Sequence, residues 1–173
     1  MTGCNYRAQP LGRKDIRAYA KRIRRILHKT NEEYFDIIRV AEIFFPAIFG
    51  DRYSFEILSR EEMGNNHGLT NPETGRVMIR EDIYEGACRG EGRDRLTIAH
   101  ELGHFLLHNG ITLGLARVVE NEKVPTYCNP EWQATAFAGE LLMDSDIIRD
   151  MTVPEISKKC GVSIDAASFQ KRH

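Results

Sequence analysis

The chain has 173 residues, of which 42% are hydrophobic, and its formal net charge is −1 at pH 7. This length allows one domain with a substantial core, and the near-neutral charge gives no general reason to expect nucleic acid or an anionic membrane as the main partner. No apolar run reaches the roughly 18 residues that span a bilayer, and the start does not resemble a signal peptide, so we expect a cytoplasmic protein without a membrane anchor. The four cysteines lie far apart, which favours reduced thiols over disulfides.

The N-terminal region is expected to form two packed helices. From Arg13 to His28, apolar residues recur every three or four positions, and the opposite face carries a row of arginines and lysines. This basic face is either solvated or a surface for nucleic acid or an acidic partner. A second helix is expected from Asn31 or Glu32 to Phe45, where Pro46 should end it.

A small sheet is expected in the next thirty residues. Apolar and polar residues alternate over 52–58, as in a half-buried strand, and residues 76–80 form a second short strand. The intervening segments 64–68 and 71–75 have the composition of turns. We therefore predict a hairpin or a small antiparallel sheet, followed by a helical turn over 81–88.

The main chemical signal is an H-E-x-x-H motif at residues 100–104, within a helix expected to start at Arg93 or Asp94. The spacing places His100 and His104 on one helix face, where both can bind one zinc ion with Glu101 beside them as a base. So short a motif also occurs by chance on ordinary helix surfaces. This helix, however, carries enough apolar residues to be largely buried, and a divalent metal offsets the desolvation of buried imidazoles and a carboxylate.

Two further residues of this helix are expected to support the site. His108 lies one turn beyond His104, about 6 Å along the axis, so it cannot bind the same ion and has a supporting or structural role. Gly103 costs of order 1 kcal/mol relative to alanine inside a helix, which predicts close approach by another element or by a substrate.

A catalytic zinc site needs a third protein ligand and one open position. The next helix should begin after the N-cap Asn129, with Pro130 in its first position, and it offers Glu131 and Glu140. The chain between His104 and Glu131 is long enough for a loop and a return. Glu131 alternatively only stabilises the helix N-terminus, and Glu140 alternatively lies on the surface.

Tyr127, just before this helix, is our candidate for stabilising the oxyanion of the transition state. The choice rests on its position alone. The alternative is an ordinary half-buried tyrosine.

Residues 83–88, 90–108 and 131–143 together resemble the ImmA/IrrE family of zinc metallopeptidases. The resemblance is closest over residues 76–143 and looser over the whole chain. It implies an α+β, gluzincin-like fold in which a small antiparallel sheet packs with a helical metallopeptidase core. It also implies that zinc is held by His100, His104 and Glu131, with Glu101 as the general base. Family members act on helix-turn-helix repressors, and some are encoded beside toxin–antitoxin pairs.

The chain departs from the family pattern at two positions. Thr135 stands where the family usually has Asn or Asp, a position expected to hydrogen-bond the second nitrogen of a ligand histidine. A hydroxyl accepts this bond less strongly than a carboxylate, so we expect lower metal affinity or activity. Asp144 replaces the usual proline after the helix, which should alter only how the chain leaves it.

We predict a metallopeptidase domain over residues 1–143 and a small helical segment over 144–173. Within this segment, 145–151 should form a short helix, and 153–168 should form two helices joined by a turn at Gly161. The spacing resembles a DNA-reading helix-turn-helix motif. Because few positive charges lie here, packing or docking of a repressor is expected rather than direct nucleic-acid binding.

The sequence thus predicts a zinc-dependent endopeptidase that cleaves a helix-turn-helix repressor or an antitoxin-like regulator. Zinc should polarise the scissile carbonyl, while Glu101 takes a proton from water and passes it to the leaving amine. The substrate should lie extended along a strand edge, for which we nominate residues 76–80. Two alternatives are a non-catalytic metal-site module that regulates a partner, and a DNA-binding regulator that uses residues 154–171.

Overall fold

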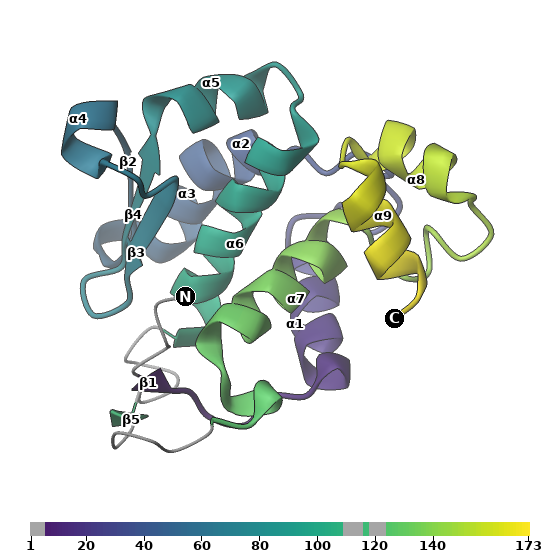
Figure 1. The fold of residues 1–173 in the computed structure, drawn as a ribbon, viewed down its shortest axis with the longest axis horizontal. Helices are drawn as coiled ribbons and strands as arrows, with labels where there is room; N and C mark the ends of the chain where they lie inside the picture. Colours follow the sequence, from purple (N-terminus) through teal and green to yellow (C-terminus); the bar gives the residue numbers. More distant parts are fainter. Residues whose placement is uncertain (1–5, 109–115, 118–123) are drawn as a thin grey trace.

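The computed structural model describes residues 6–108, 116–117 and 124–173. Its central element is α6 (Gly92–His108), which packs against α7 (Pro130–Leu142) and, on another side, against the sheet and α5 (Glu81–Cys88) (Figure 1). The helix α1 (Arg13–Ile26) packs on α7. These elements share one hydrophobic core, so the predicted α+β fold is confirmed.

The sheet has three strands, β2 (Ser54–Leu58), β3 (Gly68–Asn71) and β4 (Arg76–Arg80), in the order β2-β4-β3. β4 pairs parallel with β2 and antiparallel with β3. The sheet is therefore mixed, whereas the sequence predicted an antiparallel one. The connection from β2 to β4 contains both α4 (Arg60–Met63) and β3, and this length lets β4 run in the same direction as β2.

The prediction that residues 76–80 form the edge strand for a substrate is wrong, because β4 is paired on both sides. Among the described strands, the outer edges of the sheet belong to β2 and β3. β3 escaped prediction because its first and last residues, Gly68 and Asn71, belong to segments with turn composition and only two residues lie between them. The short pair of β1 (Tyr6–Arg7) and β5 (Ala116–Arg117) forms a separate two-stranded sheet.

Pro46 lies inside a helical stretch instead of ending it. This stretch comprises α2 (Ile37–Arg39), the π-helical turn η1 (Val40–Phe44) and α3 (Phe45–Phe49), followed by the 3₁₀ turn η2 (Gly50–Arg52). The N–H of Phe45 donates to the carbonyl five residues back, and this wider turn accommodates a proline that has no N–H of its own. The stretch begins later than predicted because Asp36 caps it.

Part of the basic face of α1 points into the molecule and is not available to nucleic acid, whereas Lys14, Arg22 and Arg25 of the same helix are exposed. The Nε atoms of Arg13 and Arg17 each lie 2.9 Å from a carboxylate oxygen of the buried Glu140 on α7. Lys21 pairs with aspartates just beyond α7, and the buried Arg24 donates to backbone carbonyls. Acidic residues of this same chain thus neutralise much of that charge.

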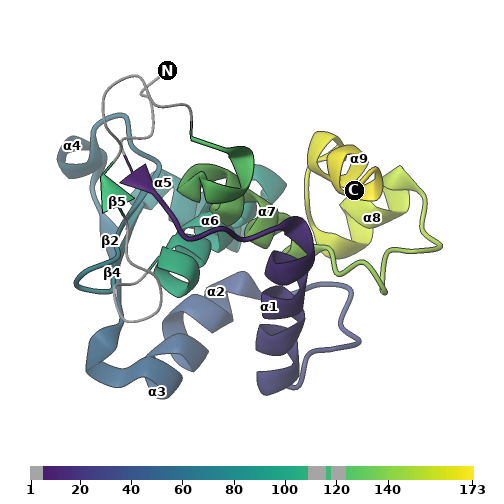
Figure 2. The same cartoon turned by 90° about the horizontal axis from the view of Figure 1, so that it is seen from below.

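The C-terminal region contains α8 (Val153–Cys160) and α9 (Ile164–Lys171), joined by a turn at Gly161 with φ 64°. This confirms the predicted pair of helices, which lie together at the end of the molecule away from the sheet (Figure 2). The helix predicted over 145–151 is absent from this described segment, which forms turns. The Ile148 carbonyl accepts from the N–H of Met151 in a turn, and the side chain of Lys171 donates to the carbonyls of Ile148 and Arg149.

Among the described residues, no helix has both the length and the apolar character needed to cross a bilayer. The division of the chain at residue 143 stays a prediction. Residues on both sides of it contribute to the same hydrophobic core.

Candidate metal centre

The helices α6 and α7 bring the three predicted ligands together. His100 and His104 lie on one face of α6, and Glu131 occupies the first turn of α7. The side chain of Asn129 caps that turn by accepting from the N–H of Glu131, as predicted. Ligand atoms of the two histidines and the glutamate all lie within 4.8 Å of one another.

Gly103 allows the two helices to approach this closely. A Cβ atom at Gly103 would lie 3.1 Å from the ring of Phe137 and 3.2 Å from the backbone of Ala134, both on α7. The predicted close approach at Gly103 is therefore confirmed, and the approaching element is α7. Without it, Glu131 would be held farther from the histidines.

The distances within the cluster fit a tetrahedral zinc ion. The Nε2 atoms of His100 and His104 are 3.0 Å apart, and they lie 3.2 Å and 3.4 Å from the two carboxylate oxygens of Glu131. Ligands placed at zinc–nitrogen and zinc–oxygen bond lengths in a tetrahedron are about 3.3 Å apart. Two histidines and a glutamate are also a ligand set that hydrolytic zinc sites use. The donor atoms present thus match zinc in kind and in spacing.

The charge of the cluster also favours a cation. The hydrogen bond from His100 holds the pKa of the Glu131 carboxyl well below its usual range. The carboxylate is therefore ionised at neutral pH. It can serve as an anionic ligand without first losing a proton.

A chain of hydrogen bonds fixes the tautomer of His104. The amide nitrogen of Gln133 donates to the backbone carbonyls of Gln9 and Tyr127, which leaves its oxygen to accept from Nε2 of His108 at 2.8 Å. Burial lowers the pKa of His108 to about 4, so His108 is neutral and its Nδ1 accepts from Nδ1 of His104 at 3.0 Å. Nε2 of His104 is then left without a proton and faces Glu131 and His100.

The second ring nitrogen of His100 faces Thr135. Its Nδ1 lies 3.3 Å from the hydroxyl oxygen of Thr135 on α7, at the long end of hydrogen-bond distances. This is the contact expected of Thr135. Its effect on metal affinity stays a prediction.

Glu101 is buried against β3, the strand that the sequence did not predict. The hydroxyl of Thr70 lies 2.7 Å from Oε2 of Glu101 and 3.1 Å from its backbone carbonyl. A Cβ atom at Gly68 would come within 2.6 Å of Cγ of Glu101, so only glycine fits there without displacing the side chain. β3 therefore sets the position of the predicted general base.

The other predicted site residues lie apart from the ligand cluster or remain untested. Tyr127 lies in the 3₁₀ turn η3 (Thr126–Cys128), where its side chain is half-exposed and its backbone carbonyl accepts from Gln133. Its role at the oxyanion stays a prediction. Glu140, the second candidate ligand, is neither a ligand nor a surface residue, because it is buried with Arg13 and Arg17.

Sequence reasoning missed Thr70 and Gln133. Thr70 gave no signal, because it lies in the two-residue gap between the segments that were predicted as turns. Gln133 did give one, since a glutamine in an otherwise apolar stretch of a buried helix must find hydrogen-bond partners.

A comparison with curated proteins found no match. A family model does match: the IrrE N-terminal-like domain of the peptidase M78 family covers residues 55–169, well over half of the chain. The matched range includes β3, the H-E-x-x-H helix and the helix that carries Glu131. This chain therefore belongs to the IrrE-like peptidase M78 family of metallopeptidases.

Proposed function

We propose that the protein is a zinc-dependent endopeptidase that acts in the cytoplasm on a helix-turn-helix repressor or an antitoxin-like regulator. The observation that carries this proposal is the clustering of His100, His104 and Glu131, which offer one donor atom each within 4.8 Å of one another. The repressor as substrate rests on the family resemblance alone.

His100, His104 and Glu131 would hold the ion, and the chain's other residues would handle protons. When bound, zinc supplies Lewis acidity that polarises a scissile carbonyl and acidifies a water molecule. Glu101 then accepts the proton from water and delivers it to the leaving amine. Thr70 and Gly68 hold the Glu101 side chain at the edge of the site during both transfers.

The substrate would lie along β3. This strand is an outer strand of the described sheet, and its Thr70 bonds to Glu101, so a peptide pairing with β3 would pass the proposed base. Backbone hydrogen bonds to a strand edge hold a peptide extended without demanding a particular sequence. Specificity must then come from pockets for side chains.

The packing of α9 disfavours the DNA-binding alternative. A Cβ atom at Gly92, at the start of α6, would come within 2.6 Å of the backbone of Val162 and Ser163. The start of α9 thus abuts α6, whereas a recognition helix presents its N-terminal residues to base edges.

The test compares the wild type with Glu101→Gln. Each zinc-loaded protein is incubated with helix-turn-helix proteins encoded by neighbouring genes, and cleavage is followed by mass spectrometry. We expect the wild type to cut one of them and the variant to be slower by at least about 100-fold, since it lacks the general base. Equal cleavage would contradict the mechanism. Binding without cleavage by either protein would favour the non-catalytic module.

A further inference from the structure

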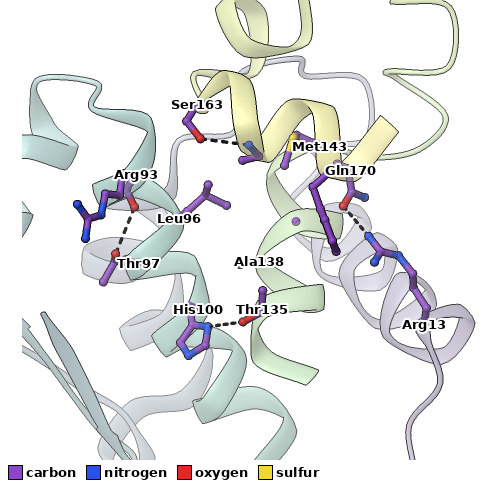
Figure 3. A pocket seen from close by; sticks show the side chains of 13 residues that line it. Arg13, Arg93, Leu96, Thr97, His100, Thr135, Ala138, Met143, Ser163 and Gln170 are labelled. Carbon is purple, nitrogen blue, oxygen red and sulfur yellow. Dashed lines mark hydrogen bonds between the residues drawn. The ribbon is translucent and has the colours of Figure 1, made fainter. Parts of the chain in front are cut away.

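A pocket opens directly beside the candidate metal centre. Its volume is about 460 Å³, within the range of small-ligand sites, and α6, α7 and α9 form its walls (Figure 3). His100 and Thr135 lie at one end of it. The pocket therefore borders one of the three candidate metal ligands.

The walls of this pocket are mostly apolar. Figure 3 shows Leu96 of α6 and Ala138 of α7 on opposite sides of the space. The C-terminal helix adds Ala166 and the half-exposed Phe169. The described lining includes no acidic residue.

The two arginines of the lining do not make the pocket a site for anions. Arg13 is committed to other partners, since it donates to Glu140 at 2.9 Å and to Gln170 at 2.6 Å. The guanidinium of Arg93 is turned away from the space in Figure 3. The rest of the lining is mostly apolar, so the pocket suits an uncharged apolar group.

The wall that α9 provides is firmly anchored. The buried Arg95 of α6 donates to the carbonyls of Cys160 at 2.7 Å and Gly161 at the turn before α9, and to that of Phe35. At the other end of α9, Gln170 packs closely against α7: a Cβ atom at Gly139 of α7 would lie 2.7 Å from Oε1 of Gln170. The pocket thus exists before a ligand arrives.

We infer that this pocket is a specificity site that takes a large apolar side chain, such as leucine, from the peptide residue beside the scissile bond. The C-terminal hairpin is then part of the substrate site. The inference rests on the proposed function, because the bound peptide must be held at the metal for its side chain to reach the pocket.

The test uses amino-acid hydroxamates, which chelate zinc through a common group and differ only in their side chains. Binding of glycine, leucine and glutamate hydroxamates to the zinc-loaded full chain is measured by calorimetry. Leucine hydroxamate should bind about tenfold or more tighter than glycine hydroxamate, because its side chain is buried. Glutamate hydroxamate should gain nothing over glycine hydroxamate.

Variants of α9 assign any such gain to the pocket. Ala166→Leu fills the space, so leucine hydroxamate should lose its advantage while glycine hydroxamate binds as before. Ser168→Leu, on the same helix but outside the lining, is the matched control and should keep the advantage. Phe169→Ala removes a half-exposed wall residue with little risk to folding, and it should reduce the advantage several-fold.

The outcomes separate the two proposals. If no hydroxamate binds, the proposed zinc site is contradicted, and the pocket inference is overturned with it. If glycine and leucine hydroxamates bind equally, or if Ala166→Leu keeps the full advantage, only the pocket inference is overturned.

Discussion

Gln133 is linked to the candidate ligand His104 by two hydrogen bonds that run through His108. Its amide has one possible orientation, because both of its N–H groups meet backbone carbonyls, and this orientation passes through His108 to set which nitrogen of His104 is free. The sequence placed His108 in a supporting role but did not show its partner. That partner depends on how α7 rotates against α6, which a single sequence does not contain.

Gln133→Met should therefore weaken zinc binding. Methionine keeps the volume and the apolar contacts but leaves His108 free to take the other tautomer, and loss of such a supporting bond lowers metal affinity by about 10–100-fold. The measurement is the zinc dissociation constant by chelator competition, alongside the thermal midpoint of the metal-free protein. Zinc affinity within about twofold of the wild type would show that the chain of hydrogen bonds does not act on the metal.

Thr135 is expected to keep zinc affinity lower than a carboxylate at the same position would. Its hydroxyl faces His100 at 3.3 Å from an exposed position, so it can be replaced without disturbing the core. Thr135→Asp should tighten zinc binding several-fold, because a carboxylate accepts from an imidazole N–H more strongly than a hydroxyl does. Thr135→Val, which has no acceptor, should weaken it. An unchanged zinc affinity in both variants would show that the side chain at position 135 does not affect zinc binding.

At the scale of elements, the C-terminal hairpin is fixed to the start of the motif helix. Gly92 abuts the α8–α9 turn, and Arg95, one turn along α6, bonds to that turn's carbonyls. The sequence predicted both helices from their caps and the glycine between them. The sequence did not predict where these two helices dock, because nothing distinguishes Arg95 from any other charged residue near the start of a helix.

Gly92→Ala should destabilise the protein by about 1–3 kcal/mol, because the added Cβ meets backbone atoms that can move only with the whole turn. Gly12→Ala is the matched control, since its nearest neighbour would lie at an ordinary 3.4 Å. The free energy of unfolding is measured in urea for both. If the two substitutions cost the same, the close packing at Gly92 is not a source of stability.

At the scale of the whole molecule, sequence reasoning succeeded where the signal is local and failed where it depends on pairing. The capped helices α7, α8 and α9 and the H-E-x-x-H helix follow from their periodicity and end residues. The mixed sheet does not, because the direction in which β4 pairs with β2 is a long-range choice. The helical stretch continues through Pro46 because of a π-helical turn, and the sequence pattern does not predict such a turn.

The same distinction applies to charge. A basic helix face looks available in a sequence, and only the packed molecule shows that Glu140 lies beneath it. The clustering of His100, His104 and Glu131, by contrast, was predictable. The two histidines are fixed by helical spacing, and the helix that carries Glu131 has a recognisable start.

The central claim is that His100, His104 and Glu131 together form a zinc centre, with Glu101 outside the ligand set. Native mass spectrometry of the full chain with a small excess of zinc tests this directly. We predict one zinc ion per chain in the wild type and in Glu101→Gln, and none in His104→Ala or Glu131→Gln at the same zinc concentration. A wild type that binds no zinc, or a Glu131→Gln variant that retains it with wild-type affinity, would contradict the account.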